Sequence, residues 1–142
     1  MKTNNIFFSF TSYDIINNNG NPTNKVVSVP KKISHSQYLK NTIIGCLTVI
    51  IDIKNIRIPL MKDIRTSHDM LLWLDILKNE EYAFGLNQVL ASYRLSSNSN
   101  TKNKLFAAID VWRVYRKHQG LNVIDSFYNF MHYAFNALKK RI

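Results

Sequence analysis

The sequence predicts an α/β fold, in which three or four strands, with one helix between them in the chain, are followed by C-terminal helices. Segments 6–16 and 43–53 are rich in β-branched and aromatic residues, which favour strands. Residues 67–78 combine a polar start with an apolar run, which predicts a buried helix. Strands followed by helices are typical of a layered α/β structure. We therefore expect a sheet-bearing part in residues 1–103 and amphipathic helices in 104–142.

A hairpin is predicted near the N-terminus. The first strand, 6–16, runs into Asn17-Asn18-Asn19-Gly20-Asn21-Pro22, a strong turn signal. Residues 25–29 can then return as the second strand. Further along, residues 82–95 predict either a pair of strands or one long bent strand.

The most apolar segment is 43–53, and its β-branched residues predict a buried central strand. Gly45 inside it indicates that another group approaches the backbone closely. Cys46, a cysteine in an apolar strand, is expected to be a buried and inert thiol.

Helix signals recur along the chain. Ser34 is expected to cap a short helix over 34–40, and Ser67 to cap the helix over 67–78. Gly120 is expected to end a helix that begins near Leu105. The last predicted helix begins near Asn122 and carries one apolar stripe. Its members are Ile124, Phe127, Tyr128, Met131, Phe135 and Leu138.

Length and composition limit the kind of protein. A chain of 142 residues with 46% apolar residues predicts one domain, or a large piece of one, with a packed core. The net charge of +10 indicates an anionic partner. One cysteine excludes an intramolecular disulfide, and no apolar run approaches the ~18 residues of a membrane span. We expect a cytoplasmic protein, with a peripheral position on the inner face of the membrane as an option.

Asp69 is the first candidate for chemistry. It lies in the first turn of the predicted helix, where free backbone N–H groups and the helix dipole stabilise negative charge. A carboxylate fixed there, at the rim of a core, is a candidate general base. The alternative is that Asp69 only serves the helix start, and the local pattern favours that alternative.

Other candidate sites are weaker. The four histidines are scattered without the spacing of metal ligands, so we expect no zinc site. Arg94 follows a predicted strand and is either an anion ligand or an ordinary surface arginine. Residues 113–118 mix basic and aromatic residues, but no nucleic-acid-binding signature accompanies them, so we expect no nucleic-acid partner.

The last helix, with Lys139-Lys140-Arg141 at its end, fits an anionic membrane surface. A core helix, or one packed on a partner, is the equal alternative.

Four segments, in order, resemble the C-terminal half of bacterial family 2 glycosyltransferases that build lipopolysaccharide and capsule glycans. The four segments are Phe8-Ser9-Phe10-Thr11-Ser12-Tyr13 with Asn19-Gly20-Asn21, Ile44 to Asp52, Arg65 to Leu74, and Tyr93-Arg94-Leu95 with Ser97 and Ser99. The resemblance covers nearly the whole chain. It implies that residues 1–103 are the acceptor-side half of a GT-A type fold, with part of its mixed α/β sheet.

The implied activity is inverting transfer of a sugar from a nucleotide-diphospho-sugar to a hydroxyl of a glycan or lipid-linked acceptor. Asp69 would be the general base. Gly45, Cys46 and Thr48 would line the acceptor side, next to His68 and Trp73. Arg94, with Ser97 and Ser99, would close over the diphosphate, because a guanidinium matches phosphate geometry.

The sequence also departs from this family. No βαβ nucleotide-binding half and no Asp-x-Asp motif is present. The resemblance therefore implies a truncated or split member, with little activity alone. A divalent metal, Mg or Mn, is expected only together with the N-terminal half, supplied as a separate chain. An unpaired sheet edge predicts dimerisation. The alternative function is a non-catalytic module that binds a membrane or a partner.

Overall fold

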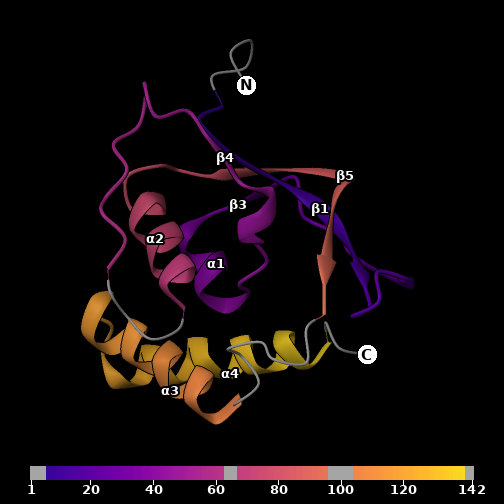
Figure 1. Cartoon of the computed structure of the whole chain (residues 1–142). Coiled ribbons are helices and arrows are strands. Elements are labelled where there is room, and N and C mark those ends of the chain that lie inside the picture. The colour runs from indigo at the N-terminus through magenta and orange to yellow at the C-terminus, as the bar shows by residue number, and fades with distance from the viewer. Residues whose placement is uncertain (1–5, 63–66, 96–103, 140–142) are drawn as a thin grey trace.

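The computed structural model describes residues 6–62, 67–95 and 104–139. A five-stranded mixed sheet lies on one side of the molecule, helices α1 and α2 lie in the middle, and α3 and α4 form a layer on the far side (Figure 1). The predicted fold class, a mixed α/β sheet followed by C-terminal helices, is confirmed.

Strand β1 (Phe8–Ile16) is the centre of the sheet. It pairs in parallel with β5 (Ala83–Arg94), and its other edge is shared by β2 (Pro22–Val27) and β4 (Ile50–Ile51), both antiparallel. The short β3 (Lys32–Ile33) pairs with the far edge of β5. The predicted hairpin is confirmed, and residues 82–95 form one long strand.

The predicted central strand over 43–53 is wrong. That segment forms a 3-10 turn, η2 (Cys46–Thr48), and then only the two-residue β4. The backbone N–H of Thr48 donates to the Gly45 carbonyl at 3.0 Å, and its side-chain hydroxyl donates to the same oxygen at 2.9 Å. These bonds hold the turn, while β5, which comes later in the chain, takes the place beside β1.

Helix α1 (His35–Lys40) begins as predicted. The Ser34 hydroxyl accepts from the Gln37 N–H, and the Gln37 side chain accepts from the Ser34 N–H at 2.9 Å. This reciprocal pair is a capping box, and it fixes where the short helix starts. The buried residues of α1, Tyr38 and Leu39, then face the core.

Helix α2 (His68–Leu77) is apolar on nearly every face, and that is why it lies inside the molecule. Its Trp73 ring packs against Phe8 of β1 at 5.5 Å between ring centroids. Ser67 is the N-cap residue, as predicted, but its side chain makes no capping hydrogen bond. Its backbone is left-handed, with φ 62°, and only its carbonyl joins the helix, accepting from the Leu71 N–H.

The C-terminal layer consists of α3 (Lys104–Arg113), a π-helical turn η4 (Val114–His118) and α4 (Val123–Lys139). Gly120 has φ +69° and follows η4, so the helical segment that starts with α3 ends there, as predicted. The Asn136 side chain of α4 donates to the Lys40 carbonyl of α1 at 3.0 Å, and this bond attaches the layer to the core.

Tyr115 of η4 also attaches this layer to α1, and we predict how much its hydrogen bond contributes to the free energy of unfolding. Its hydroxyl donates to the carbonyl of Leu39, in the last turn of α1, where carbonyls lack helical partners. Tyr115→Phe should lower the free energy of unfolding at pH 7 by about 1–3 kcal/mol, because the buried carbonyl loses its donor. Urea unfolding of both proteins measures this difference.

The same pair of proteins should differ in pH dependence. Burial, and then the neighbouring Tyr133, raise the pKa of the Tyr115 phenol. An unfolded chain ionises its tyrosines near pH ~10, while the folded chain still holds this proton. The Tyr115 contribution to stability is therefore complete below about pH 10 and is lost as pH rises further. A stability gap between the two proteins that stays constant up to pH 11 would contradict this prediction.

Candidate functional site

The candidate site is built around Asp69 at the start of α2. The carboxylate is half-buried, and its Oδ1 accepts a hydrogen bond from the backbone N–H of Met70 at 2.8 Å. The helix start thus fixes one oxygen of the side chain. A fixed, partly accessible carboxylate is able to accept a proton from a hydroxyl placed beside it.

The charge of this carboxylate acts on two side chains from other elements. Burial and then the charge of Asp69 raise the pKa of the Tyr38 phenol on α1 well above its ordinary value. Partial desolvation and then the charge of Asp69 raise the pKa of the Cys46 thiol in η2. We call Asp69, Tyr38 and Cys46 the Asp69 cluster, in which both neighbours keep their protons at neutral pH.

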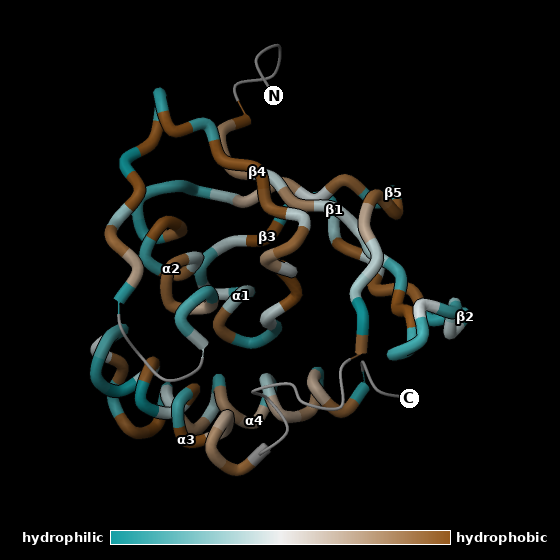
Figure 2. The backbone as a smooth tube through the Cα atoms, in the orientation of Figure 1, coloured by the Kyte–Doolittle hydropathy of each residue, from teal (hydrophilic) through white to brown (hydrophobic). Residues whose placement is uncertain are grey.

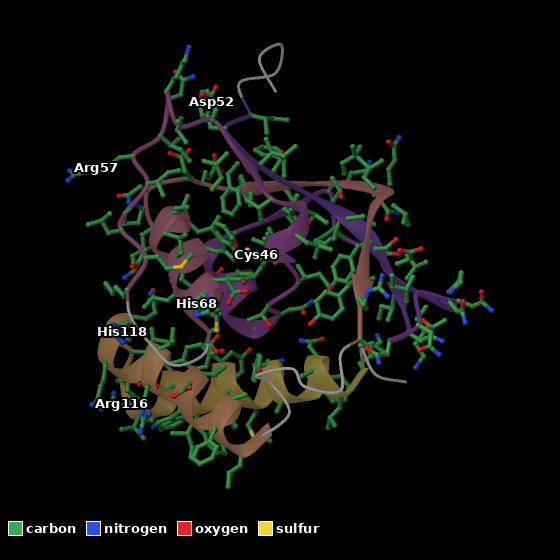
Figure 3. The ribbon with its side chains drawn as sticks, in the orientation of Figure 1. Cys46, Asp52, Arg57, His68, Arg116 and His118 are labelled. Atoms are coloured by element: carbon green, nitrogen blue, oxygen red, sulfur yellow. The ribbon has the colours of Figure 1, made fainter. Side chains whose placement is uncertain are left out.

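Cys46 differs from its prediction in one respect. The thiol is exposed, because η2 turns it away from the core, so the prediction of a buried cysteine is wrong. Its raised pKa disfavours the thiolate, and the thiolate is the reactive form. The cluster therefore carries an exposed S–H, on the cysteine labelled in Figure 3, and no activated nucleophile.

Gly45 and Thr48 shape the wall beside Cys46. A Cβ atom at Gly45 would lie 2.8 Å from Cε1 of Tyr13, so the tyrosine ring of β1 packs directly on this backbone. The predicted close approach at Gly45 is confirmed. Thr48 is buried, and its hydroxyl is bonded to the Gly45 carbonyl. Both residues therefore hold the turn that presents Cys46.

The two remaining candidates on α2, His68 and Trp73, differ in their exposure to solvent. His68 is exposed at the helix start, on the side that faces the α3–α4 layer (Figure 3). Trp73 is 5% exposed and packs in the core, so its contact is with Phe8 and not with solvent. Of these two residues, His68 is the one that a ligand can reach.

Arg94 lies at the end of β5, and its guanidinium is bound to the hairpin. Its Nη1 donates to the Asn18 carbonyl at 3.0 Å and packs over Gly20. These contacts belong to the β1–β2 turn and do not include the Asp69 cluster. Ser97 and Ser99, the other predicted residues of the diphosphate loop, lie outside the described residues.

A surface cleft of about 830 Å³ lies at the opposite end of α2. Asp75 in its wall forms ion pairs with Lys62 and Lys78, each at 3.5 Å. Because both lysines neutralise Asp75, this carboxylate is not available to bind a charged ligand in the cleft. The cleft and the Asp69 cluster are at different ends of one helix.

Sequence reasoning missed Tyr38 as a member of the cluster. It stands 31 positions before Asp69, and only the packing of α1 beside α2 brings the two together. The capping signal at Ser34 predicts the helix, but no local pattern indicates which neighbour Tyr38 will face.

In the described part of the chain, no three His, Cys, Asp or Glu side chains come together as metal ligands, so these residues do not fit a divalent-metal site. None of the helices in residues 6–62, 67–95 and 104–139 is long and apolar enough to cross a membrane.

The α/β fold and the carboxylate at a helix start fit the glycosyltransferase class, and comparison with known proteins confirms this resemblance. The chain is 43% identical, over 135 residues, to the glycosyltransferase TuaG of Bacillus subtilis (strain 168), which is assigned to teichuronic acid biosynthesis. It is 36% identical over 141 residues to WfgD and 32% over 143 residues to WfaP, both from Escherichia coli. WfgD and WfaP are each named as a UDP-Glc:alpha-D-GlcNAc-diphosphoundecaprenol beta-1,3-glucosyltransferase.

These alignments cover 95–99% of this chain but 54% of each of the three relatives. The chain thus spans about half the length of the curated relatives it matches. No protein-family model matches the sequence, and no solved structure matches it. The chain is a homologue of glycosyltransferases over that half.

Proposed function

We propose that this chain carries the acceptor-side part of an inverting glycosyltransferase of surface-glycan synthesis. The observation that carries the proposal is the Asp69 carboxylate, fixed by the Met70 N–H, in a chain homologous to glycosyltransferases along nearly all its length. The donor is a nucleotide-diphospho-sugar. The acceptor is a hydroxyl of a lipid-linked sugar, as in the names of the two E. coli relatives.

In the proposed reaction Asp69 removes the proton of the acceptor hydroxyl as its oxygen attacks the anomeric carbon. The new bond forms on one face of the sugar, and the bond to the diphosphate oxygen breaks on the other. The nucleoside diphosphate leaves with the electron pair, and the proton stays on the Asp69 carboxyl. The hydroxyl becomes acidic only as the attack proceeds, so an ordinary carboxylate suffices as the base.

The neighbours of Asp69 have supporting roles in this proposal. The protonated, exposed Cys46 thiol is a weak hydrogen-bond donor for the acceptor. The buried Tyr38 phenol stays neutral and leaves Asp69 as the charged group of the cluster. The nucleotide-binding residues, and the ligands of the Mg or Mn ion that would stabilise the diphosphate, come from outside the described residues, as a separate chain or as the remainder of a longer protein.

A chimera tests this function. This chain replaces the aligned 141 residues of WfgD, and the purified chimera is given UDP-glucose, divalent metal and a GlcNAc-diphospholipid acceptor. We expect glucose transfer above the level of this chain alone. Intact WfgD is the positive control. A chimera that melts cooperatively and binds UDP, yet transfers no glucose, would contradict the proposal.

We also propose that the protein works on the cytoplasmic side, at the surface of an anionic membrane. An acceptor with a long lipid tail remains in the bilayer, so the enzyme must come to it. The net charge of +10 favours approach to an anionic surface.

A further inference from the structure

Helix α4 packs Phe130 and Tyr133 against the core, together with two buried polar residues, and exposes its apolar stripe to solvent. Ser126 and Asn129 are buried, and their side chains bond to backbone carbonyls of the preceding turn. The apolar stripe predicted from the sequence lies on the opposite side of the helix. Its six members, Ile124, Phe127, Tyr128, Met131, Phe135 and Leu138, are each 51–80% exposed.

Helix α3 has the same orientation. Its buried residues face the core, whereas Leu105, Phe106 and Ile109 are exposed. Trp112 packs edge-on against Phe130 of α4 at 6.0 Å between ring centroids, which joins the two helices into one layer. Figures 1 and 2 show this layer beneath α1 and α2, with hydrophobic positions recurring along both helices.

Exposed apolar side chains gathered on one layer mark an interaction site, because water solvates them poorly. The charges around it select among the partners. Residues 104–142 contain seven Lys and Arg against two acids. One of these acids, Asp110, is buried and paired with Arg113 at 3.1 Å. The other, Asp125, accepts a hydrogen bond from the Asn122 amide at the helix start.

A second copy of the chain would bring two basic surfaces together, whereas an anionic bilayer attracts them. The stripe also has the composition of an interfacial helix, with aromatic residues, leucine, isoleucine and methionine. Lys40 lies at its border, with the ammonium 4.8 Å from the centre of the Tyr128 ring. A lysine so placed covers apolar surface with its stem while its charge reaches a phosphate.

We propose that the outer face of α3 and α4 docks on an anionic bilayer, with the apolar stripe of α4 among the lipid headgroups. This inference deepens the proposed membrane location and rests on it. The docked layer would also position the site. Helix α4 packs on α1, where the Asn136 side chain bonds to the Lys40 carbonyl, and α1 in turn packs on α2, which carries Asp69. A lipid-linked diphosphate acceptor at the headgroup level would approach the carboxylate from this side.

Vesicle flotation with the full chain tests the docking. Vesicles of phosphatidylcholine with phosphatidylglycerol are compared with phosphatidylcholine alone. We expect the chain to float with the anionic vesicles, less at high salt and less with the neutral ones. The double substitution Phe127→Ser and Phe135→Ser should lower the partition coefficient at least about tenfold, since two interfacial aromatic rings are lost.

The matched control is Leu60→Ser with Leu90→Ser, which removes two exposed apolar side chains outside this layer. Control and parent should bind alike, and circular dichroism verifies that both variants fold. Equal binding by the two double variants overturns the inference, as does the absence of binding by the parent. A parent dimer that dissociates in the Phe127/Phe135 variant, with vesicle binding unchanged, assigns the face to a second copy and also overturns it. Flotation needs no sugar transfer, so its failure is separate from a failure of the transfer assay.

Discussion

Asp69→Asn in the WfgD chimera is expected to lower the turnover of glucose transfer by roughly 10²–10⁴-fold, the usual contribution of a general base. Asparagine keeps the size of the side chain, and its amide oxygen can still accept from the Met70 N–H. What it loses is the ability to take a proton. The effect should therefore fall on kcat, with a small change in KM for the acceptor.

Asp75→Asn is the matched control for this prediction. Asp75 lies on the same helix, and its ion pairs with the exposed Lys62 and Lys78 contribute little. An asparagine there can still accept the hydrogen bond from the Gln119 side chain. Initial rates over a range of acceptor concentrations should be nearly those of the parent chimera. If both substitutions lower kcat equally, or if Asp69→Asn leaves it unchanged, Asp69 serves only the helix start.

The parts of the fold that could be predicted depend on local signals. The turn at Asn17–Pro22, the capping box at Ser34 and the left-handed Gly120 each act within a few residues. Each of these local features is found in the structure. The apolar run of α2 is also a local signal, because a helix that is apolar on nearly every face must be buried.

The segment 43–53 could not be predicted from its own residues. Its β-branched composition favours a strand, but its course depends on Tyr13, more than thirty positions earlier, which packs on Gly45. One edge of β1 is also taken by β5, which arrives later in the chain. Long-range packing therefore overrides the local preference, as is common for strands.

In the candidate site, too, local features could be predicted and long-range contacts could not. The place of Asp69 in the first turn of a helix follows from the sequence, and the structure has it there. The neighbours of Asp69 do not follow from the sequence, because Tyr38 and Cys46 belong to separate elements, α1 and η2. Arg94 is a related case: its position after a strand is local, but its bond to the Asn18 carbonyl joins residues 76 positions apart.

Gly85→Ala is expected to cause the largest loss of stability of the substitutions considered. A Cβ atom there would lie 2.0 Å from the Pro30 carbonyl oxygen and 3.0 Å from Cγ2 of Val29. The neighbour is backbone, so no side-chain rotation relieves the clash. The Gly85 N–H also donates to the Lys31 carbonyl at 2.9 Å, and this bond must break if the two segments separate.

We expect a loss of about 3 kcal/mol or more in the free energy of unfolding, at the upper end of the usual cost of overpacking. For a chain of 142 residues this corresponds to a fall in Tm of roughly 10 °C. The control is Gly120→Ala, where no atom lies within 4 Å of the new Cβ and only the φ of +69° is strained. That strain costs about 1 kcal/mol.

The comparison of the two glycine variants separates contact from backbone strain. If Gly85→Ala and Gly120→Ala lower Tm equally, the close approach of the 29–31 segment to β5 is not rigid. That segment runs directly into β3 and α1, and α1 carries Tyr38 next to Asp69. A larger effect at Gly85 should therefore also appear at the site, as a lower kcat of the chimera below its melting temperature.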